Sequence, residues 1–393
     1  MAPGANGVLF VSQDASRTGA PMALLRFLRW FKKNGNHPFA VLLPTSAQPW
    51  GELIPDFEEV AETWEIDRSR WIAGGTRARA LRLIGLNGWA RRADVAEIHR
   101  FARRCTPGLV YKNSISSAWA DMLPREIPVL THVHELEYAF RRQSPPHLAR
   151  LIAETRRFIA CSDAVRQNLV VKQGIPTERI ETVHEPVDIA EMRPGRTRQQ
   201  VFEELQLPDG ATLVIGAGTG NWRKGGDLFV QLARVVCRQR SDVYFVWIGG
   251  FGSDIDEFEH DVRLAGLTER VRLRRPSRLY LDYFAAADLF VLTSREDPYP
   301  LVCLEAAALE KPTVCFAGAG GIPEFVENDC GFIVPYLDIA AMADRVTFLL
   351  NSPERRLAMG VVARRKVEQN HDICAIGPRI MEIIEKTISR TVL

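Results

Sequence analysis

Two acidic side chains lie eight residues apart in the segment LFVLTSREDPYPLVCLEAAALEKP, residues 289–312. An apolar run ends near Thr293, and Asp297 lies in the loop after it. Pro300 suits the first position of a helix, because its ring fixes φ and its missing N–H would have no acceptor there. Glu305 would then lie in the second turn, and the two carboxylates could accept hydrogen bonds from hydroxyl groups of one ligand, such as a ribose and a sugar ring. In the alternative, Asp297 caps the helix and Glu305 lies on its solvated face.

The start of this helix also suits a negatively charged ligand. Backbone amides in the first turn of a helix have no acceptor within the helix and lie at the positive end of its dipole. We therefore expect Pro300, Leu301 and Val302, which begin the helix, to contact a diphosphate or sugar oxygens.

Two adjacent basic residues, Arg223 and Lys224, follow an apolar run in TLVIGAGTGNWRKGGDLFVQLA, residues 212–233. We expect the run to form a strand and Lys224 to open the helix after it. A cation fixed there could hold a diphosphate. When a sugar leaves a diphosphate, negative charge grows on the leaving group, so the cation would stabilise the transition state more than the ground state. A solvated basic turn is the alternative.

Glycines in the same segment raise another possibility, because Gly216, Gly218 and Gly220 are similar to a dinucleotide-binding fingerprint. That fingerprint requires Gly-x-Gly-x-x-Gly, and Asn221 occupies the third position. The acidic residue expected about 20 residues later falls at Asp242, before the next apolar run rather than at its end. An NAD-dependent oxidoreductase is therefore the weaker interpretation.

Two histidines alternate in VLTHVHELEYAF, residues 129–140, so His132 and His134 share one face of a predicted strand, and Glu135 follows at its end. We expect His134 to donate a hydrogen bond to a sugar or phosphate, with His132 packed beneath it. A metal pair is a weak alternative, because the sequence shows no matching third histidine or cysteine ligand. A structural role for His134 is the other alternative.

A turn with a glycine lies between the first apolar run and the first helical pattern, in SQDASRTGAPMALLRF, residues 12–27. Gly19 would let the backbone approach a phosphate closely. Pro21 offers no N–H, so this site has one donor fewer, and a simple tight turn is the alternative.

Two further charged segments have a structural explanation as well as a functional one. Asp254 and Asp256 form Asp-x-Asp, which could hold a divalent metal, but acidic residues at a helix start are explained by the helix dipole. Residues 66–104 contain ten arginines against three acidic residues. This segment could contact anionic lipid or an acidic acceptor, or be a solvated face.

The composition is that of an ordinary globular enzyme, with 46% hydrophobic and 25% charged residues among 393. The net charge of +2, from 50 basic and 48 acidic side chains, predicts no general attraction to nucleic acid. The seven cysteines have no Cys-x-x-Cys spacing, which favours thiols in a reducing compartment. No signal-like or membrane-spanning apolar segment is evident, so we expect a cytoplasmic protein.

Short apolar runs alternate with helical patterns throughout, which predicts an α/β protein with parallel sheets. The alternation breaks at residues 185–208, which contain proline, glycine and charge but no strand. We predict a domain over residues 1–191, a second over residues 192–374, and a helix over residues 375–393 that returns to the first. Ligands of such sheets bind beyond the carboxyl ends of the strands, so a site in the cleft between two Rossmann-like domains is expected.

Together these segments resemble the family-4 retaining glycosyltransferases of the GT-B fold over nearly the whole chain. The Glu-x7-Glu signature of that family corresponds to Asp297 and Glu305, and its diphosphate lysine corresponds to Lys224. Its Gly-Gly-x-x-Glu element corresponds to GAGGIPEFV, residues 318–326, which contains Glu324.

The resemblance implies roles for first-domain residues too. His134 matches the family's histidine near the sugar, and Gly19 the turn near the donor phosphates. Thr219 stands where family members commonly carry an arginine, so Arg223 or another cation would have to substitute. Asp297 in place of glutamate shortens the reach by one methylene, which leaves the identity of the donor sugar open.

The implied activity is transfer of a sugar from a nucleoside-diphosphate sugar to a hydroxyl of a glycan or lipid-linked acceptor, with retention of configuration and no metal ion. Glu305 would bind the ribose and Asp297 the sugar. Base recognition is expected around residues 273–277, which include Arg274. A catalytically silent nucleotide-sugar-binding protein is the alternative of a different class. Peripheral contact with the inner face of a membrane would involve the Arg-rich segment.

Overall fold

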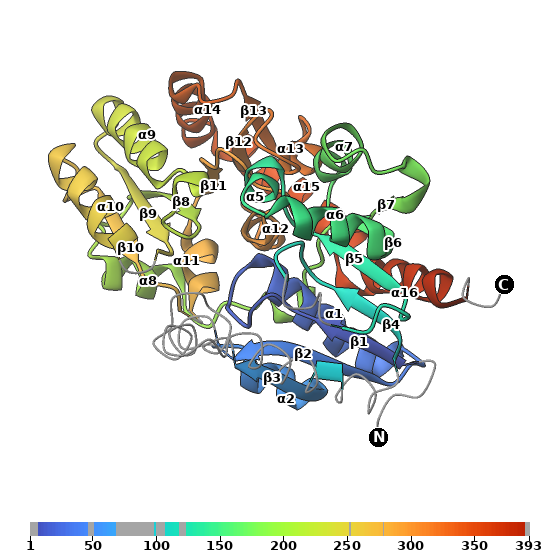
Figure 1. The fold of residues 1–393 in the computed structure, drawn as a ribbon. Helices are drawn as coiled ribbons and strands as arrows, with labels where there is room; N and C mark the ends of the chain where they lie inside the picture. Colours follow the sequence, from blue (N-terminus) through green and yellow to red (C-terminus); the bar gives the residue numbers. More distant parts are fainter. Residues whose placement is uncertain are drawn as a thin grey trace, which may run out of the picture. The chain divides into compact units, whose positions relative to one another are not determined.

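The computed structural model of the chain forms two compact units, Met1–Pro186 with Ile376–Leu393, and Val187–Ala375. The residues that it describes are 7–45, 51–67, 98–99, 107–117, 123–250, 253–277 and 279–389. Each unit contains one parallel sheet (Figure 1), which confirms the predicted class of two Rossmann-like α/β domains. The chain passes from the first unit to the second after Pro186, whereas the sequence pattern placed the boundary near Met192.

The first unit has a seven-stranded sheet in the order β3-β2-β1-β4-β5-β6-β7. Its strands are β1 (Gly7–Val11), β2 (Phe39–Thr45), β3 (Glu62–Asp67), β4 (Pro107–Lys112), β5 (Val129–Val133), β6 (Thr155–Ala160) and β7 (Ile180–Thr182). Every residue of β1 and β5 is buried, as expected for parallel strands that helices cover on both faces. The order reverses between β1 and β4, which pair in parallel, and such a reversal is where open α/β sheets bind ligands.

Helices of the first unit connect these strands and include the end of the chain. They are α1 (Gly19–Asn34), α2 (Ile54–Val60), α5 (Glu137–Arg141), α6 (Pro145–Glu154), α7 (Asp163–Gln167) and most of α16 (Ile373–Ser389). In α16, Arg379 donates a hydrogen bond of 3.0 Å to the Thr182 carbonyl. Arg156 donates one of 3.2 Å to the Thr387 carbonyl. These contacts join the last helix to the first unit, as the sequence pattern predicted.

The second unit has a six-stranded sheet in the order β10-β9-β8-β11-β12-β13. Its strands are β8 (Thr212–Ala217), β9 (Val243–Ile248), β10 (Val271–Arg274), β11 (Leu289–Leu292), β12 (Thr313–Phe316) and β13 (Gly331–Val334). All pair in parallel. The order reverses between β8 and β11, so the loops after these two strands are expected to carry a ligand site.

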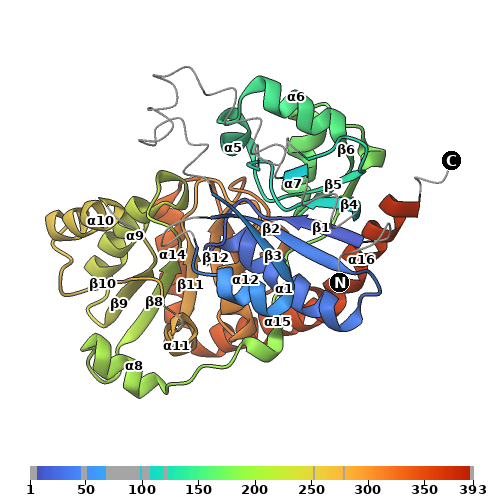
Figure 2. The same cartoon turned by 60° about the horizontal axis from the view of Figure 1, so that its bottom comes forward.

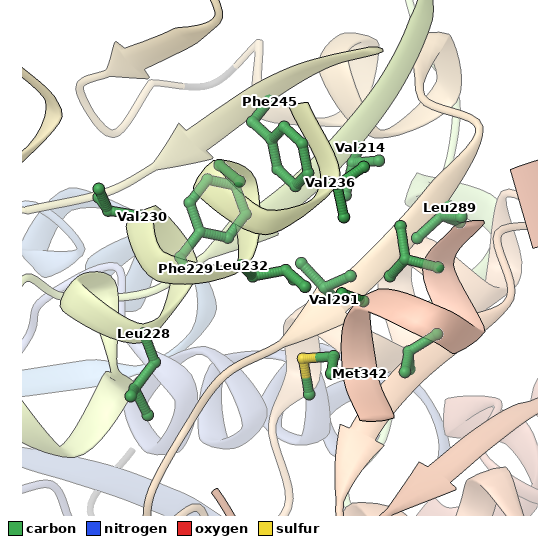
Figure 3. Packing of buried hydrophobic residues seen from close by; sticks show 14 of the residues in the cluster. Val214, Leu228, Phe229, Val230, Leu232, Val236, Phe245, Leu289, Val291 and Met342 are labelled. Carbon is green, nitrogen blue, oxygen red and sulfur yellow. The ribbon is translucent and has the colours of Figure 1, made fainter. Parts of the chain in front are cut away.

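Helices cover both faces of this second sheet (Figure 2). One group is α9 (Gly226–Gln239), α10 (Ser253–Leu264) and α14 (Ile339–Leu350), and the other is α8 (Arg198–Leu205), α11 (Tyr280–Ala286), α12 (Leu301–Ala308) and α15 (Pro353–Asn370). The first group buries its apolar face against the strands, where Phe229, Phe245 and Met342 belong to one continuous core (Figure 3). None of the described helices is long and apolar enough to cross a membrane.

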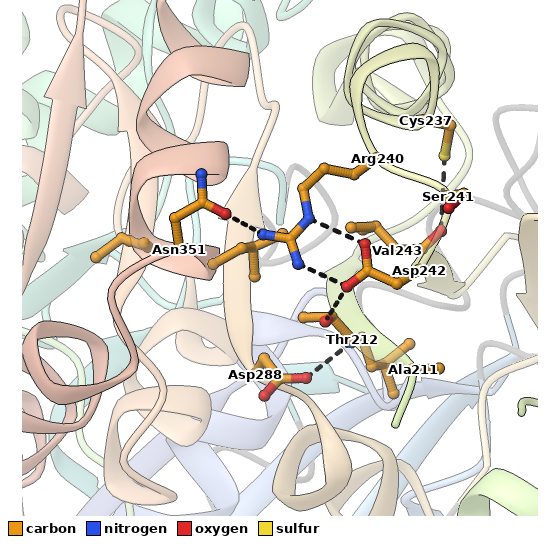
Figure 4. A network of polar contacts seen from close by, with 12 residues as sticks. Ala211, Thr212, Cys237, Arg240, Ser241, Asp242, Val243, Asp288 and Asn351 are labelled. Atoms are coloured by element: carbon orange, nitrogen blue, oxygen red, sulfur yellow. Dashed lines mark hydrogen bonds and ion pairs between the residues drawn. The ribbon is translucent and has the colours of Figure 1, made fainter. Parts of the chain in front are cut away.

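A polar network ties the amino ends of the second sheet's strands together (Figure 4). Arg240 donates to both carboxylate oxygens of Asp242, at 3.0 and 2.5 Å, and also contacts Asn351. Thr212 donates to Asp242 at 3.2 Å, and Asp288 accepts a hydrogen bond of 2.8 Å from the Leu213 amide. The hydrogen bonds from Arg240 lower the pKa of Asp242 to about 2. Asp242, the acidic residue of the dinucleotide interpretation, therefore has a structural partner.

Gly225 connects α9 to the preceding turn, which carries Lys224. This position requires a glycine for two reasons. Its φ is 70°, and an added Cβ would lie 2.0 Å from the Thr293 carbonyl oxygen. Thr293 also donates a hydrogen bond of 2.8 Å to the Gly225 carbonyl. The turn after β8 and the loop after β11 are therefore in direct backbone contact.

We expect Gly225→Ala to lower the free energy of unfolding by more than the roughly 1–2 kcal/mol that a left-handed alanine costs, because the clash with Thr293 adds to that cost. Gly210→Ala is the matched control, since its φ is 78° and no atom lies within 4 Å of the added Cβ. Urea unfolding of both variants checks the difference. Equal losses would contradict the proposed backbone contact.

Candidate functional site

Three loops at carboxyl ends of strands meet in the second unit. Lys224 follows β8, Asp297 follows β11, and residues 318–321 follow β12. The Lys224 Nζ atom lies 2.7 Å from Asp297 Oδ2. Arg223 lies 3.5 Å from Asp297 Oδ1. The basic pair and the first acidic residue of the sequence motif are therefore in contact.

The Asp297 side chain is only 6% exposed, and Ser294 donates to its carboxylate at 3.0 Å. Burial of a carboxylate raises its pKa. The charges of Lys224 and Arg223 and the hydrogen bonds from Lys224 and Ser294 outweigh burial, so the pKa of Asp297 lies below its ordinary value. Burial, together with the charge of Arg223, lowers the pKa of Lys224 despite its contact with Asp297. These three groups carry one net positive charge, which suits an anion.

Backbone hydrogen bonds hold the loop of Asp297 on both sides. The Asp297 amide donates to the Ala319 carbonyl at 2.6 Å, and the Gly321 amide donates to the Asp297 carbonyl at 3.2 Å. Gly320 has a φ of 135°, and an added Cβ would lie 1.8 Å from the Asp297 carbonyl oxygen. Gly320 of the Gly-Gly-x-x-Glu element thus lets two loops approach each other closely.

The other side of the Asp297 loop rests on the turn after β8. The Arg295 amide donates to the Arg223 carbonyl at 2.8 Å, and Arg223 donates to the Glu296 carbonyl at 2.7 Å. Arg295 also binds both carboxylate oxygens of Asp227, at 2.8 and 2.7 Å. The loop is therefore preorganised by contacts that do not involve a ligand.

Helix α12 begins at Leu301, and Pro300 is its N-cap residue with a φ of −70° and extended ψ. The sequence pattern predicted Pro300 one position further into the helix. No side chain caps α12, so the alternative in which Asp297 is the cap is wrong. Glu305 lies in the second turn and is 4% exposed, so the alternative of a solvated face is wrong as well.

Lys224 lies in a short 3-10 turn, Trp222–Lys224, and α9 begins only at Gly226. The sequence pattern, which placed the start of the helix at Lys224, therefore put that start two residues too early. Asn221 caps this turn by accepting a hydrogen bond of 3.3 Å from the Lys224 amide. An added Cβ at Gly218 would lie 3.1–3.2 Å from the Lys224 side chain.

The glycines that suggested a dinucleotide site have packing roles. An added Cβ at Gly216 would lie 2.8 Å from Phe229 and 3.1 Å from Trp247, and Gly218 makes room for Lys224. Close packing thus explains two of the glycines without a dinucleotide.

The remaining predicted donor-binding residues of the second unit lie on different elements. Thr219 accepts a hydrogen bond of 2.8 Å from Asn221 in the turn after β8. Arg274, at the end of β10, lies 3.4 Å from the Glu204 carboxylate. Glu324 is partly buried in the first turn of α13 (Ile322–Val326).

A second group of polar side chains lies in the first unit, in the carboxyl-terminal parts of β4 and β5 and in the segments that follow β4, β5 and β7. His134 Nδ1 lies 2.5 Å from Glu185 Oε1, and both side chains are about 5% exposed or less. His134 Nε2 lies 3.1 Å from Asn113 Oδ1. The His132 ring lies 4.1 Å from the His134 ring, and Tyr111 forms a hydrogen bond of 2.6 Å with His132. Thus His132 does lie beside His134, and both nitrogens of His134 contact protein groups.

Burial and neighbouring charges shift the pKa values of the two histidines in opposite directions. Burial lowers the pKa of His134, but the carboxylates of Glu185 and Glu135 outweigh it and raise the pKa above the ordinary value. Burial and the charge of His134 hold the pKa of His132 well below its ordinary value. Burial also raises the pKa of Glu135.

Sequence reasoning missed Glu185 and Cys161, which both lie close to His134. Cys161 directly follows β6, and Glu185 follows the short strand β7. The available signal was their position after apolar runs, since carboxyl ends of neighbouring parallel strands share one edge of a sheet.

Other predicted features are exposed or outside the described residues. Gly19 is exposed as the first residue of α1. Asp256 is exposed on α10, and the side chain of Asp254 lies outside the described part. Most of the Arg-rich segment, at 68–97 and 100–104, also lies outside it.

We expect Asp297→Asn to destabilise the protein by about 1–3 kcal/mol, because it leaves the partly buried Lys224 ammonium without its charged partner. Adding Lys224→Met should recover part of this loss, with a coupling energy of roughly 0.5–3 kcal/mol. Urea unfolding of the two single variants and the double variant measures it.

The control cycle uses Arg364→Met and Glu368→Gln, an ion pair on α15 whose side chains are 45% and 43% exposed. Such exposed helix pairs couple by only about 0.3–0.5 kcal/mol. Strictly additive losses at Lys224 and Asp297 would show that their contact does not stabilise the fold.

Comparison with known proteins identifies two matching families. The family described as Glycosyltransferase Family 4 matches residues 19–191, and the family described as Glycosyl transferases group 1 matches residues 197–366. A D-inositol 3-phosphate glycosyltransferase 1 from Catenulispora acidiphila is 31% identical over 220 residues, which are 53% of this chain and 52% of the relative. Spore coat protein SA of Bacillus subtilis is 24% identical over 292 residues, 68% of this chain and 76% of the relative. The alignment thus spans about half of the first of these relatives.

Solved structures extend the similarity to almost the whole chain. Anabaena HepE in complex with UDP-glucose superposes with a TM-score of 0.78 and 19% identity, covering 97% of this chain and 99% of HepE. Sucrose-phosphate synthase from Thermosynechococcus elongatus gives a TM-score of 0.78 and 16% identity, covering 98% of this chain and 100% of the synthase. At these identities the structures show the fold alone. With the two family matches, they show that the chain belongs to the family-4 glycosyltransferases and has the GT-B fold.

Proposed function

We propose that the protein transfers a sugar from a nucleoside-diphosphate sugar to a hydroxyl group of a glycan or lipid-linked acceptor, with retention of anomeric configuration and no metal ion at the diphosphate. The observation that carries this proposal is the contact of Lys224 with the buried carboxylate of Asp297 beside Arg223. The neighbour HepE is described in complex with UDP and with UDP-glucose, which supports a donor of this class.

The basic pair supplies the charge that the reaction needs. When the bond between the anomeric carbon and the diphosphate breaks, its electron pair stays on the diphosphate oxygen, and negative charge grows there. The two positive charges of Lys224 and Arg223 and the single negative charge of Asp297 leave a net charge of +1. Both basic side chains are held in place before a ligand arrives. Preorganised charge of this kind stabilises a transition state without reorganisation during the reaction. A divalent metal is therefore not needed for this task.

The acidic pair would orient the rest of the donor. Once the diphosphate replaces Asp297 as the partner of Lys224, Asp297 would accept hydrogen bonds from sugar hydroxyls. Glu305 would accept hydrogen bonds from the ribose. Both carboxylates are buried at the start of α12 or in the loop before it, where they lose little freedom on binding. The first-turn amides of Leu301 and Val302 would contact the donor oxygens.

First-unit residues complete the proposed donor contacts. His134 would orient the sugar by exchanging its Nε2 contact with Asn113 for a sugar hydroxyl, and Gly19 would lie near the phosphates. In the second unit, Arg274, Thr219 and Glu324 would contribute to base or sugar recognition.

A nucleotide-sugar-binding protein without activity is the alternative function of a different class. It would bind UDP-glucose through the same residues and form no product. An NAD-dependent oxidoreductase would bind NAD instead, yet Asp242, Gly216 and Gly218 already have structural roles.

We expect Lys224→Ala to lower turnover of a nucleoside-diphosphate sugar by about 10²–10³-fold, the usual cost of removing one preorganised donor at a developing negative charge. Mass spectrometry of products from a set of activated sugars that includes UDP-glucose identifies the donor. Initial rates with that donor then compare the variants.

Lys366→Ala is the matched control, because Lys366 is another lysine of the second unit that pairs with acids, Glu327 and Asp329, at 2.7 and 2.9 Å. It should leave turnover unchanged. All rates are measured with and without EDTA, and loss of wild-type activity in EDTA that Mg²⁺ restores would refute metal independence. Unchanged turnover in Lys224→Ala would refute the electrostatic role of the lysine.

A further inference from the structure

Three side chains with metal-binding atoms lie at the carboxyl ends of three neighbouring strands in the first unit. His134 follows β5, Cys161 follows β6 and Glu185 follows β7. These strands pair in the order β5-β6-β7, all in parallel, so their carboxyl ends share one edge of the sheet. The fold therefore brings together a histidine, a cysteine and a glutamate that are far apart in sequence.

One ligand atom from each of these residues lies within 4.8 Å of the other two. Zinc binds nitrogen, sulfur and oxygen at about 2.0–2.3 Å, so two ligands of a tetrahedral ion lie roughly 3.3–3.8 Å apart. His134 Nδ1 and Glu185 Oε1 are 2.5 Å apart, and a zinc ion would replace the proton between them and widen that separation. All three groups already lie close to one another without the ion.

The surroundings of His134 orient the ring for a metal at Nδ1. The amide nitrogen of Asn113 donates to the Ala20 carbonyl at 2.8 Å, so the oxygen of the same amide faces His134 Nε2 at 3.1 Å. Nε2 therefore carries the hydrogen, and Nδ1 points to Glu185. Metal-binding histidines generally donate their second ring N–H to an oxygen in this way.

A buried oxygen atom without a hydrogen-bond partner points to a missing ligand. Glu185 Oε2 is buried, and no partner for it exists within the described residues. A buried carboxylate oxygen without a partner is costly. A cation bound by the glutamate would remove that cost.

The charges and chemical types of the three groups also fit zinc. A thiolate and a carboxylate neutralise the two positive charges of Zn²⁺, and a neutral imidazole adds a third ligand. Zinc accepts this mixture of sulfur, nitrogen and oxygen, whereas Mg²⁺ and Ca²⁺ prefer oxygen alone. Three protein ligands leave a fourth tetrahedral position for water.

We propose that His134, Cys161 and Glu185 form a zinc-binding site in the first unit. The zinc site uses other types of side chain than the proposed diphosphate contacts, which involve lysine and arginine in the second unit. Because His134 is also proposed to orient the sugar, zinc would compete for a side chain of the transfer reaction. The test below measures bound metal rather than turnover, so its result does not depend on the proposed function.

The purified full-length chain is stripped with a chelator and titrated with Zn²⁺, and bound metal is counted by mass spectrometry after desalting. We expect one zinc ion per chain. Cys161→Ser and Glu185→Gln should each weaken binding by more than the roughly 10–100-fold that loss of an outer-shell partner costs. Titration with Co²⁺ should give a sulfur-to-metal charge-transfer absorption band that disappears in Cys161→Ser.

Cys315→Ser and Cys374→Ser are the control variants, since Cys315 is a buried thiol and Cys374 an exposed one, both in the second unit. Both should keep the bound zinc. Thermal unfolding checks that each variant is folded, and Glu185→Gln, which keeps the size of the side chain, serves if Cys161→Ser does not fold. Absence of stoichiometric zinc in the wild type, or equal zinc content in the wild type and in folded Cys161→Ser and Glu185→Gln, would overturn the proposal.

Discussion

The contact between Lys224 and Asp297 is the constraint on which the second unit's site depends. Asp297 is buried and Lys224 is partly buried. Each would be costly to keep charged alone, and the backbone is arranged to keep them together. Glycines at 218, 225 and 320 allow the approach of the Lys224 side chain and of three loops. A Cβ at Gly225 or Gly320 would clash with the backbone of a neighbouring loop, and a Cβ at Gly218 would press on the Lys224 side chain. The pair thus explains why the loops after β8, β11 and β12 are joined by backbone hydrogen bonds.

In both units, polar side chains gather at the carboxyl ends of parallel strands, but their chemistry differs between the units. Carboxyl ends of neighbouring parallel strands converge, so residues distant in sequence meet there. The second unit places a lysine, an arginine and two acids at this edge, which suits an anion with hydroxyl groups. The first unit places a histidine, a cysteine and a glutamate there, which suits a soft or borderline cation. Opposite these ends in the second unit, the Arg240 network is structural.

The fold was readable from the sequence because apolar runs of four to seven residues alternate with helical patterns, and helices must cover both faces of such strands. The site motif could be predicted because its members, Lys224, Asp297 and Glu305, lie next to strand ends or helix starts. Turn boundaries were less predictable, since the short turn before α9 depends on Asn221 and on the left-handed Gly225. Glu185 was missed because β7 has only three residues and the partner of Glu185 lies 51 positions away. The pairing of Arg274 with Glu204 is likewise a tertiary contact without a local signal.

Titration of the Lys224 side chain by NMR, with lysine labelled at the ε carbon, tests the central claim most directly. The account predicts a pKa below the ordinary lysine value in the free protein, because burial outweighs Asp297. It predicts that UDP raises this pKa, because a diphosphate adds negative charge at the ammonium group. A Lys224 pKa that does not change when saturating UDP binds would contradict the account, since the lysine would then not contact the diphosphate.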